Sequence, residues 1–273
     1  MNIWQILTGV FNAKPAPSTP KPPAPTPLPS TPSAIRYVEG LGVMQQGDRQ
    51  SYLTDAQIAG SAFVVPRERW KYLEPVRGSY DFTRLDSQIE RAKRAGKMFV
   101  LPVMTGKDCN PPWLDGTHNG ETLIPWSVDL RDSYRRLHIK LAAKYAGDPM
   151  LGMVWPTGPT IPSQEMHLNG FEDSPGFNSD LMRMAWFDSI YTIRDLYPGV
   201  SATLSISTQK PVKEYLNDVI EYAIKMLGQR AVFQINSLGT HTNLKAEHIL
   251  KLKELHARGF RVGAEMVGPG HTA

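Results

Sequence analysis

The segment Phe82–Met104 (FTRLDSQIERAKRAGKMFVLPVM) contains the unit from which the fold can be worked out. Its first part, Phe82–Ala95, has the 3.6-residue periodicity of an amphipathic helix, and Gly96 follows it, as glycine often follows the end of a helix. Its second part, Lys97–Met104, is a short apolar run that is typical of a buried strand. A helix that leads directly into a buried strand indicates an α/β protein.

The same alternation extends in both directions along the chain. Seven apolar, β-rich segments are predicted strands: Ile35–Val43, Ser61–Val65, Lys97–Met104, Leu151–Trp155, Val200–Ser205, Ala231–Ser237 and Phe260–Met266. Five segments between them are predicted helices: Phe82–Ala95, Leu130–Ala146, Asp180–Leu196, Val212–Leu227 and Leu244–Arg258. Strands that alternate with helices predict a parallel sheet with right-handed crossovers.

Two architectures fit this pattern, a doubly wound open sheet and a (β/α)8 TIM barrel. A doubly wound sheet usually carries a Gly-rich phosphate-binding turn after its first strand, and none follows Ile35–Val43. We therefore predict a TIM-barrel-like α/β fold. The sequence ends at Ala273, soon after the seventh predicted strand, so we expect either that the sequence is shortened or that the barrel is incomplete. An edge would then lie open between strands one and seven unless the tail, another subunit or the N-terminal peptide covers it.

The N-terminal residues differ from the rest of the chain. Residues 14–32 are almost entirely Pro, Ala, Ser, Thr and Lys, which predicts an extended linker, so the barrel domain is expected to span residues 33–273. Residues 1–13 place apolar side chains on one helical stripe and could form a short amphipathic docking peptide or a disordered tail. They are too short to span a membrane and lack the pattern of a signal peptide. The expected role is a tether to a partner or a membrane surface, in a protein that is secreted, surface-attached or virion-associated rather than cytoplasmic.

Composition and charge exclude few functions but disfavour one. The chain has 273 residues, of which 41% are hydrophobic and 21% charged, enough for one large domain. The formal charge of +4 is scattered along the helices instead of forming a basic block, so we predict no nucleic-acid partner. Cys109 is the single cysteine and cannot form an internal disulfide.

Three motifs carry a resemblance to a known superfamily. The segment Arg69–Asp86 (RWKYLEPVRGSYDFTRLD) contains a Trp, an "E-P-x-x-G-x-Y-D-F" turn and a helix start near "L-D". The segment Pro111–Leu114 (PPWL) follows the third predicted strand, and Tyr134–Pro149 precedes the fourth. Together they resemble the second to fourth units of clan A glycoside hydrolases, the β-galactosidase-like and cellulase-like barrels. The resemblance implies a TIM barrel that cleaves glycosidic bonds with retention of configuration.

Two glutamates are the predicted catalytic pair. Glu165 and Glu265 each follow or close a strand-like run, and a parallel barrel would bring both carboxylates to one rim. For an arbitrary glutamate, a helix-capping or salt-bridged surface role is the commoner explanation. The resemblance implies that Glu165, after the fourth strand, is the general acid/base and that Glu265, at the end of the seventh, is the nucleophile. In a retaining enzyme two such carboxyl groups lie about 5–5.5 Å apart.

The sequence departs from the family before the predicted acid/base. Gln164 stands where the family usually has Asn, whose amide can contact the sugar 2-hydroxyl, and a segment rich in Pro and Gly, residues 156–162, leads to it. This segment leaves open whether Glu165 lies at the rim or in the loop beyond it.

Further residues near the predicted rim are candidates for substrate binding. Tryptophan faces can stack on sugar C–H groups, and polar side chains can bind hydroxyls. Core packing, an ion pair of Arg67 with Glu68 or Asp108, and an ordinary loop histidine remain the alternatives. The candidates are Trp113, Trp70, Trp155, Gln164, Arg67, Asp108 and His167.

The pattern predicts no metal and no cofactor. The seven histidines lack the close spacing of metal ligands, and neither a Ser-His-Asp order nor a Gly-x-Ser-x-Gly elbow occurs. Two hypotheses follow. The first is a retaining glycoside hydrolase acting on a β-linked oligo- or polysaccharide. The second is a catalytically silent barrel that binds glycans or serves as a structural component of a cell-surface or virion assembly.

Overall fold

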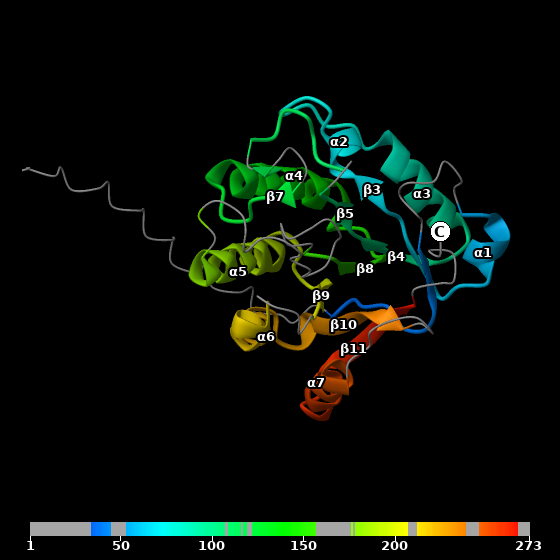
Figure 1. Ribbon diagram of the computed structural model, residues 1–273. Coiled ribbons are helices and arrows are strands. Elements are labelled where there is room, and N and C mark those ends of the chain that lie inside the picture. Colours follow the sequence, from blue (N-terminus) through cyan, green and yellow to red (C-terminus); the bar gives the residue numbers. More distant parts are fainter. Residues whose placement is uncertain are drawn as a thin grey trace, which may run out of the picture. The chain divides into compact units, whose positions relative to one another are not determined.

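Seven parallel strands form the central sheet, and the helices lie outside it (Figure 1). The computed structural model describes residues 34–44, 53–106, 109–115, 117–118, 122–156, 176, 178–206, 212–238 and 246–266. The chain divides into two units, Met1–Pro32 and Ser33–Ala273, and every described residue belongs to the second. The predictions for residues 1–13 and 14–32 therefore lie outside the described residues.

The strands of the sheet follow one another in chain order, which is the order of a barrel. Every neighbouring pair is parallel. The strands in sheet order are β1 (Gly42–Met44), β2 (Phe63–Val65), β4 (Met98–Leu101), β8 (Leu151–Val154), β9 (Ser201–Ser205), β10 (Ala231–Leu238) and β11 (Arg261–Met266). Each of the seven predicted strands overlaps one strand of this sheet, and the predicted TIM-barrel-like class is confirmed. A doubly wound sheet would have reversed its strand order near the middle.

The predicted helices end within a few residues of their observed bounds. Ser127 and Asn178 cap the first turns of α4 and α5, since their side-chain oxygens accept hydrogen bonds from Leu130 and from Asp180 and Leu181. The long helices are α3 (Thr83–Arg94), α4 (Val128–Tyr145), α5 (Ser179–Leu196), α6 (Val212–Leu227) and α7 (Ala246–Ala257). Short elements that the sequence did not reveal are α1 (Asp55–Ala59), α2 (Trp70–Leu73), β3 (Glu68–Arg69), β6 (Thr117–His118), β7 (Thr122–Leu123) and the 3-10 helix η1 (Gly228–Arg230).

Two predicted strands differ from the observed ones for local reasons. The run Lys97–Met104 is interrupted at Pro102, which has no backbone N–H to donate, and its last part forms β5 (Val103–Met104), which pairs with β3. The run Ile35–Val43 is mostly not a strand. Only its end belongs to β1, whereas Arg36 forms an isolated bridge with Val200 at the start of β9.

The segment 34–38 lies at the end of the sheet where the strands begin. The Arg36 N–H donates to Gly199 O at 2.8 Å, and the Arg36 guanidinium donates to the carbonyl oxygens of Ala146 and Asp148. The Arg261 guanidinium lies 3.7 Å from the centre of the Tyr37 ring. The folded unit therefore starts at the end opposite the carboxyl ends of the strands.

The two faces of the sheet bury different sets of side chains. The main hydrophobic core contains side chains of the strands and of the covering helices, among them Phe99, Leu137, Ile190 and Phe233. A second, smaller cluster contains the alternate strand positions Val65, Val100, Met153, Trp155 and Val232, with Val38, Met44 and Phe63 packed against it. Because side chains alternate across a strand, the second cluster is the interior of the barrel.

The barrel is open on one side among the described residues. Strands β1 and β11 stand at the two ends of the strand order, and no described strand pairs with the outer edge of either. Residues of both edge strands nevertheless line one cavity together with residues of β2, β4, β8, β9 and β10. The sheet is therefore curled, and its concave face encloses space that an eighth strand would close in a complete barrel.

A histidine in the main core makes stability depend on pH. His138 of α4 is completely buried, and its Nδ1 lies 3.1 Å from the Tyr197 hydroxyl oxygen. Burial lowers the pKa of His138 to about 3, whereas an unfolded chain has a histidine pKa of about 6.5. Between these values the unfolded state binds a proton that the folded state does not.

The contribution of His138 to the free energy of unfolding is therefore expected to be constant above about pH 6.5 and to fall by up to ~1.4 kcal/mol per pH unit below it. In His138→Gln this part of the slope should be absent. Urea unfolding at pH 8 and at pH 5 for both proteins checks the prediction, because the offset at pH 8 measures the structural cost of the substitution alone. Equal pH 8 to pH 5 differences for the two proteins would contradict it.

Candidate functional site

The carboxyl ends of the parallel strands form the rim at which barrel enzymes carry their catalytic groups. Position 265 lies in β11, next to its last residue Met266, so the backbone of Glu265 is at the rim. Strand β8 ends at Val154, and Glu165 follows eleven positions later, outside the described residues. Gln164, His167 and Asp108 also lie outside them. The structure thus brings position 265 to the predicted place.

A cavity of about 840 Å³ occupies the concave side of the sheet. We call it the barrel cavity. Its walls come from β1, β2, β4, β8, β9, β10 and β11 and from the segments that precede β1 and β11. At the rim end it is lined by Met44, Trp155 and Ala264, and at the opposite end by Gln229, His256, Gly259 and Arg261.

Trp155 lies where β8 leaves the sheet. Its side chain lines the barrel cavity and is only 3% exposed, and its backbone N–H donates to Leu101 O at 3.1 Å. The indole Nε1 is buried without a hydrogen-bond acceptor among the described residues. A buried N–H that lacks a partner costs roughly 1–3 kcal/mol.

Polar side chains of two neighbouring strands hold one another inside the barrel. The Thr203 hydroxyl donates to Gln234 Oε1 at 3.0 Å, and Gln234 Nε2 donates to Ser205 Oγ at 3.2 Å. Thr203 and Gln234 both line the barrel cavity. Their hydrogen bonds fix the Gln234 amide in one orientation and reduce the polarity that the wall presents to the cavity.

Arg67 follows β2 and lies near the same rim. Its side chain is half-buried, and Nη1 lies 2.9 Å from the Met44 Sδ at the end of β1. The neighbouring Glu68 is 2% exposed, and its carboxylate accepts hydrogen bonds from Arg84 Nε and from the Arg69 N–H, each at 3.0 Å. Arg84 is therefore an ion-pair partner of Glu68.

Trp70 and Trp113 belong to a cluster of polar and aromatic contacts around a buried glutamate. Glu74 is fully buried, and its carboxylate accepts hydrogen bonds from Trp70 Nε1 at 3.0 Å and from the Gly78 N–H at 2.8 Å. The Glu74 backbone oxygen accepts from Trp113 Nε1 at 2.9 Å. Gly78 has φ +80, a conformation that glycine adopts without strain.

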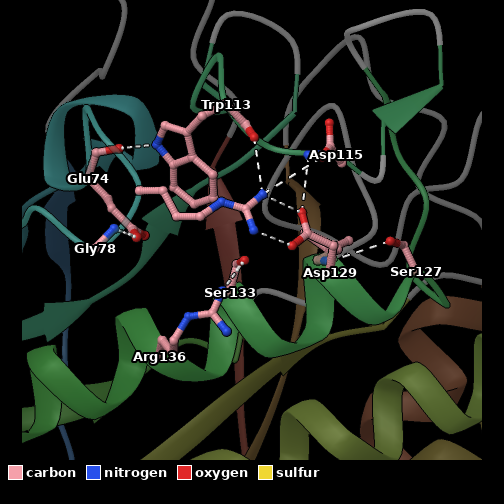
Figure 2. Close-up of polar contacts among 10 residues, drawn as sticks. Glu74, Gly78, Trp113, Asp115, Ser127, Asp129, Ser133 and Arg136 are labelled. Carbon is pink, nitrogen blue, oxygen red and sulfur yellow. Dashed lines mark hydrogen bonds and ion pairs between the residues drawn. The ribbon is translucent and has the colours of Figure 1, made fainter.

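The same cluster reaches the start of α4. The Arg77 guanidinium donates to both carboxylate oxygens of Asp129, at 2.8 and 3.0 Å, and lies 4.9 Å from the centre of the Trp113 ring. Asp129 Oδ2 also accepts from the Asp115 N–H at 3.1 Å. Figure 2 shows Trp113 lying between Glu74 and Asp129. These contacts attach the segment after β3 and the loop after β5 to the first turn of α4.

The structure thus separates the three candidate tryptophans. Trp70 is fully buried and packs edge-on against Trp113 and Tyr134. Trp113 is half-buried and holds the loop in place, whereas Trp155 lines the barrel cavity. Glu74 and Arg77 were not predicted as anchors, although both stand inside the "E-P-V-R-G" motif that carried the resemblance. The sequence offered two signals: an acidic residue, Glu74, four positions after Trp70, and an arginine, Arg77, directly before Gly78.

The described part of the chain contains no group of three or more His, Cys, Asp or Glu residues that could hold a metal ion. None of its helices combines the length and the apolar character that crossing a membrane requires.

Comparisons with known proteins agree with the resemblance found in the sequence. A family model for Beta-galactosidase, glycoside hydrolase 42, matches residues 53–123, a segment that contains Trp70, Arg77 and Trp113 and ends before Glu165. No curated protein matches the chain in sequence.

Solved structures of glycoside hydrolases share the fold. XacCel5A in complex with cellopentaose has 13% identity and a TM-score of 0.56, over 86% of this chain and 80% of that one. The catalytic domain of β-amylase from Paenibacillus polymyxa has 13% identity and a TM-score of 0.51, over 85% and 87%. Endo-glycoceramidase II from Rhodococcus sp. has 14% identity and a TM-score of 0.51, over 88% and 76%. The predicted resemblance to glycoside hydrolase barrels is confirmed.

Proposed function

We propose that the protein is a retaining glycoside hydrolase that cleaves a β-linked oligo- or polysaccharide. The observation that carries the proposal is the position of Glu265 at the carboxyl end of β11, the seventh strand of a parallel barrel. Position 265 follows residues 261–264 of the same strand, which line the barrel cavity. The family match over residues 53–123 supports the same class of enzyme.

The proposed mechanism assigns different protonation states to two glutamates. Glu265, ionised, attacks the anomeric carbon and forms a covalent glycosyl-enzyme, while Glu165, protonated, gives its proton to the leaving oxygen. Glu165 then removes a proton from water, which attacks the anomeric carbon and releases Glu265. The two steps invert the configuration twice and so retain it. The segment 155–178 would have to place Glu165 across the groove from Glu265.

Other predicted residues have supporting parts in this proposal. Gln164 precedes the proposed acid/base and could donate to a sugar hydroxyl, and His167 and Asp108 belong to loops that follow rim strands. Trp155 and Arg67 are placed at the same rim by the strands that precede them. For residues 1–13 and 14–32 we propose a docking peptide on an extended linker.

A second candidate is a catalytically silent barrel that binds glycans or has a structural role. Gln164 favours it, because this residue stands where the resemblance leads us to expect Asn directly before the acid/base. Hydrolysis distinguishes the two candidates.

Reducing-end release from a panel of plant, fungal and bacterial polysaccharides tests the proposal with the full chain. We expect release from at least one β-linked polysaccharide and none from its α-linked counterpart. If the protein binds a polysaccharide but releases no reducing ends from any member of the panel, the silent barrel becomes the better account.

A further inference from the structure

Helix α4 carries an excess of positive charge. It contains five basic residues, Arg131, Arg135, Arg136, Lys140 and Lys144, and two acidic ones, Asp129 and Asp132, so its net charge is five minus two, or +3. Arg136, Lys140 and Lys144 follow one another at four-residue steps, which places them along one stripe of the helix with a rise of ~6 Å per step. We call these three residues the basic stripe.

Two cations of the basic stripe lack an acidic partner. Arg136 and Lys140 are exposed, and among the described residues neither makes an ion pair with a carboxylate. Arg136 donates a hydrogen bond to the neutral Ser133 hydroxyl at 2.8 Å, and Figure 2 shows this contact on α4. The third cation, Lys144, pairs with Asp86. Arg136 and Lys140 are therefore available to a ligand of negative charge.

The acidic residues of α4 do not neutralise these two cations. Asp129 accepts hydrogen bonds from Arg77 through both of its carboxylate oxygens. Asp132 is exposed one turn before Arg136, and among the described residues it makes no ion pair. One free acid beside two free bases leaves the outer side of the helix positive.

Two aromatic rings lie beside the basic stripe. The Lys140 Nζ is 5.9 Å from the centre of the Tyr80 ring, and the Lys144 Nζ is 5.8 Å from the centre of the Phe82 ring. Both rings belong to the turn before α3, and their centres are 6.1 Å apart. Both are half-buried, so each keeps part of its apolar surface in solvent. Sugar rings have apolar C–H groups that can pack against such surfaces.

From these features we infer that the basic stripe, together with Tyr80 and Phe82, binds an acidic polysaccharide on the outer surface of the barrel. Anionic groups on the sugars pair with Arg136 and Lys140, and the C–H groups of a sugar ring pack against Tyr80. The inference goes beyond the proposed function, because it concerns a surface of α4 and not the rim. It holds for a hydrolase and for a silent barrel alike.

A polysaccharide fits this surface better than a membrane or a nucleic acid. A helix that binds a membrane surface presents a continuous apolar face. The exposed large aliphatic residues of α4, Val128 and Ile139, are separated by ~16 Å along the helix axis. A protein that binds duplex DNA commonly makes about 6–10 phosphate contacts, more than the three cations of the stripe provide.

Two soluble polymers with the same β-linked glucan backbone test the inference. Carboxymethyl cellulose carries carboxylates, whereas hydroxyethyl cellulose is neutral. Binding is measured by calorimetric titration of the full-length Glu265→Gln protein, in which the proposed nucleophile is removed so that the polymers stay intact. At about 20 mM NaCl we expect carboxymethyl cellulose to bind at least about tenfold more tightly. At about 0.5 M NaCl this preference should disappear, because salt screens exposed charges.

A double substitution locates the binding surface. Arg136→Gln with Lys140→Gln should weaken binding of carboxymethyl cellulose by about three- to tenfold and leave binding of hydroxyethyl cellulose unchanged. Glutamine keeps the helix propensity of these positions. Lys225→Gln with Lys253→Gln is the matched control, since it removes the same charge from exposed positions of α6 and α7. Its effect on binding should be less than about twofold.

The outcomes separate this inference from the proposed function. Equal affinity for the two polymers would overturn the site, and so would equal losses in the two double variants. Tighter binding of phosphatidylserine vesicles or of duplex DNA than of carboxymethyl cellulose at the same salt would also overturn it. If the Arg136 and Lys140 double variant does not fold by circular dichroism, Lys140→Gln alone decides against Lys225→Gln. Failure of the wild-type protein to hydrolyse any glycoside would count against the proposed function alone.

Discussion

Replacing Glu265 by Gln is expected to lower kcat/KM for glycoside hydrolysis by about 10⁴-fold or more without unfolding the protein. The amide has nearly the same shape as the carboxylate but cannot form the glycosyl-enzyme. Position 265 lies in β11 between Ala264 and Met266, which pair with Ile235 and Leu238 of β10 across a register shift. Initial rates on the substrate found in the polysaccharide panel, with thermal unfolding as a check, measure the effect.

Glu165→Gln should differ from Glu265→Gln in its dependence on the leaving group. A general acid contributes about 10²–10⁴-fold, and its contribution disappears when the leaving group needs no proton. Glu165→Gln should therefore keep most of its kcat/KM on a nitrophenyl glycoside, whereas its kcat should fall, because Glu165 is also the base of the second step. Glu265→Gln should be inactive on every substrate. Glu90→Gln is the control, since Glu90 is an exposed residue of α3 that pairs with Lys93. Equal activity of Glu265→Gln and Glu90→Gln would rule out the proposed nucleophile.

Trp70→Ala is expected to lower the free energy of unfolding by about 3–5 kcal/mol, the usual cost of removing a fully buried tryptophan. The substitution removes packing against Trp113 and Tyr134. It also takes a hydrogen bond from the Glu74 carboxylate, which has no exposure to solvent. For a domain of this size the loss corresponds to a decrease in Tm of roughly 10 °C.

Two companion variants divide the effect of Trp70→Ala into its parts. Trp70→Phe keeps most of the ring and loses only the N–H, so it should cost about 1–3 kcal/mol. Val76→Ala, at a residue that is 64% exposed on the neighbouring turn, should stay within about 0.5 kcal/mol. Chemical unfolding of the three variants gives the comparison. A cost of Trp70→Ala no larger than that of Val76→Ala would contradict the role assigned to the cluster in Figure 2.

The regular part of the fold was predictable from periodicity. The predicted helices Asp180–Leu196 and Val212–Leu227 match α5 and α6 to within one residue, because an apolar stripe must face the sheet along the whole helix. The strand Ala231–Ser237 corresponds to β10, which is covered on both faces and so reads as a nearly continuous apolar run.

Irregular segments were not predictable in the same way. Residues 34–41 are as apolar as a strand, but the observed path is fixed by the distant contacts of Arg36 with Gly199, Ala146 and Asp148. Helix α2 is a single turn whose position depends on the Glu74 carboxylate, and no periodicity is visible in four residues. Tertiary contacts rather than local preference determine both segments.

The place of residue 265 in the sheet was predictable, whereas the surroundings of the candidate tryptophans were not. The strand count placed Glu265 at the rim, because the carboxyl ends of parallel strands share one edge. The sequence could not distinguish a tryptophan that packs from one that lines a cavity. Trp70 and Trp155 are both buried and both close to a strand end, and only the identity of their neighbours separates them.

The anomeric configuration of the first product, followed by proton NMR during hydrolysis of a β-glycoside by the wild-type protein, tests the central claim most directly. Two glutamates that act by double displacement predict that the β-anomer appears first and then equilibrates with the α-anomer. Initial release of the α-anomer would contradict the assignment of Glu265 as a nucleophile, and the absence of any product would contradict the assignment of the barrel as a glycosidase.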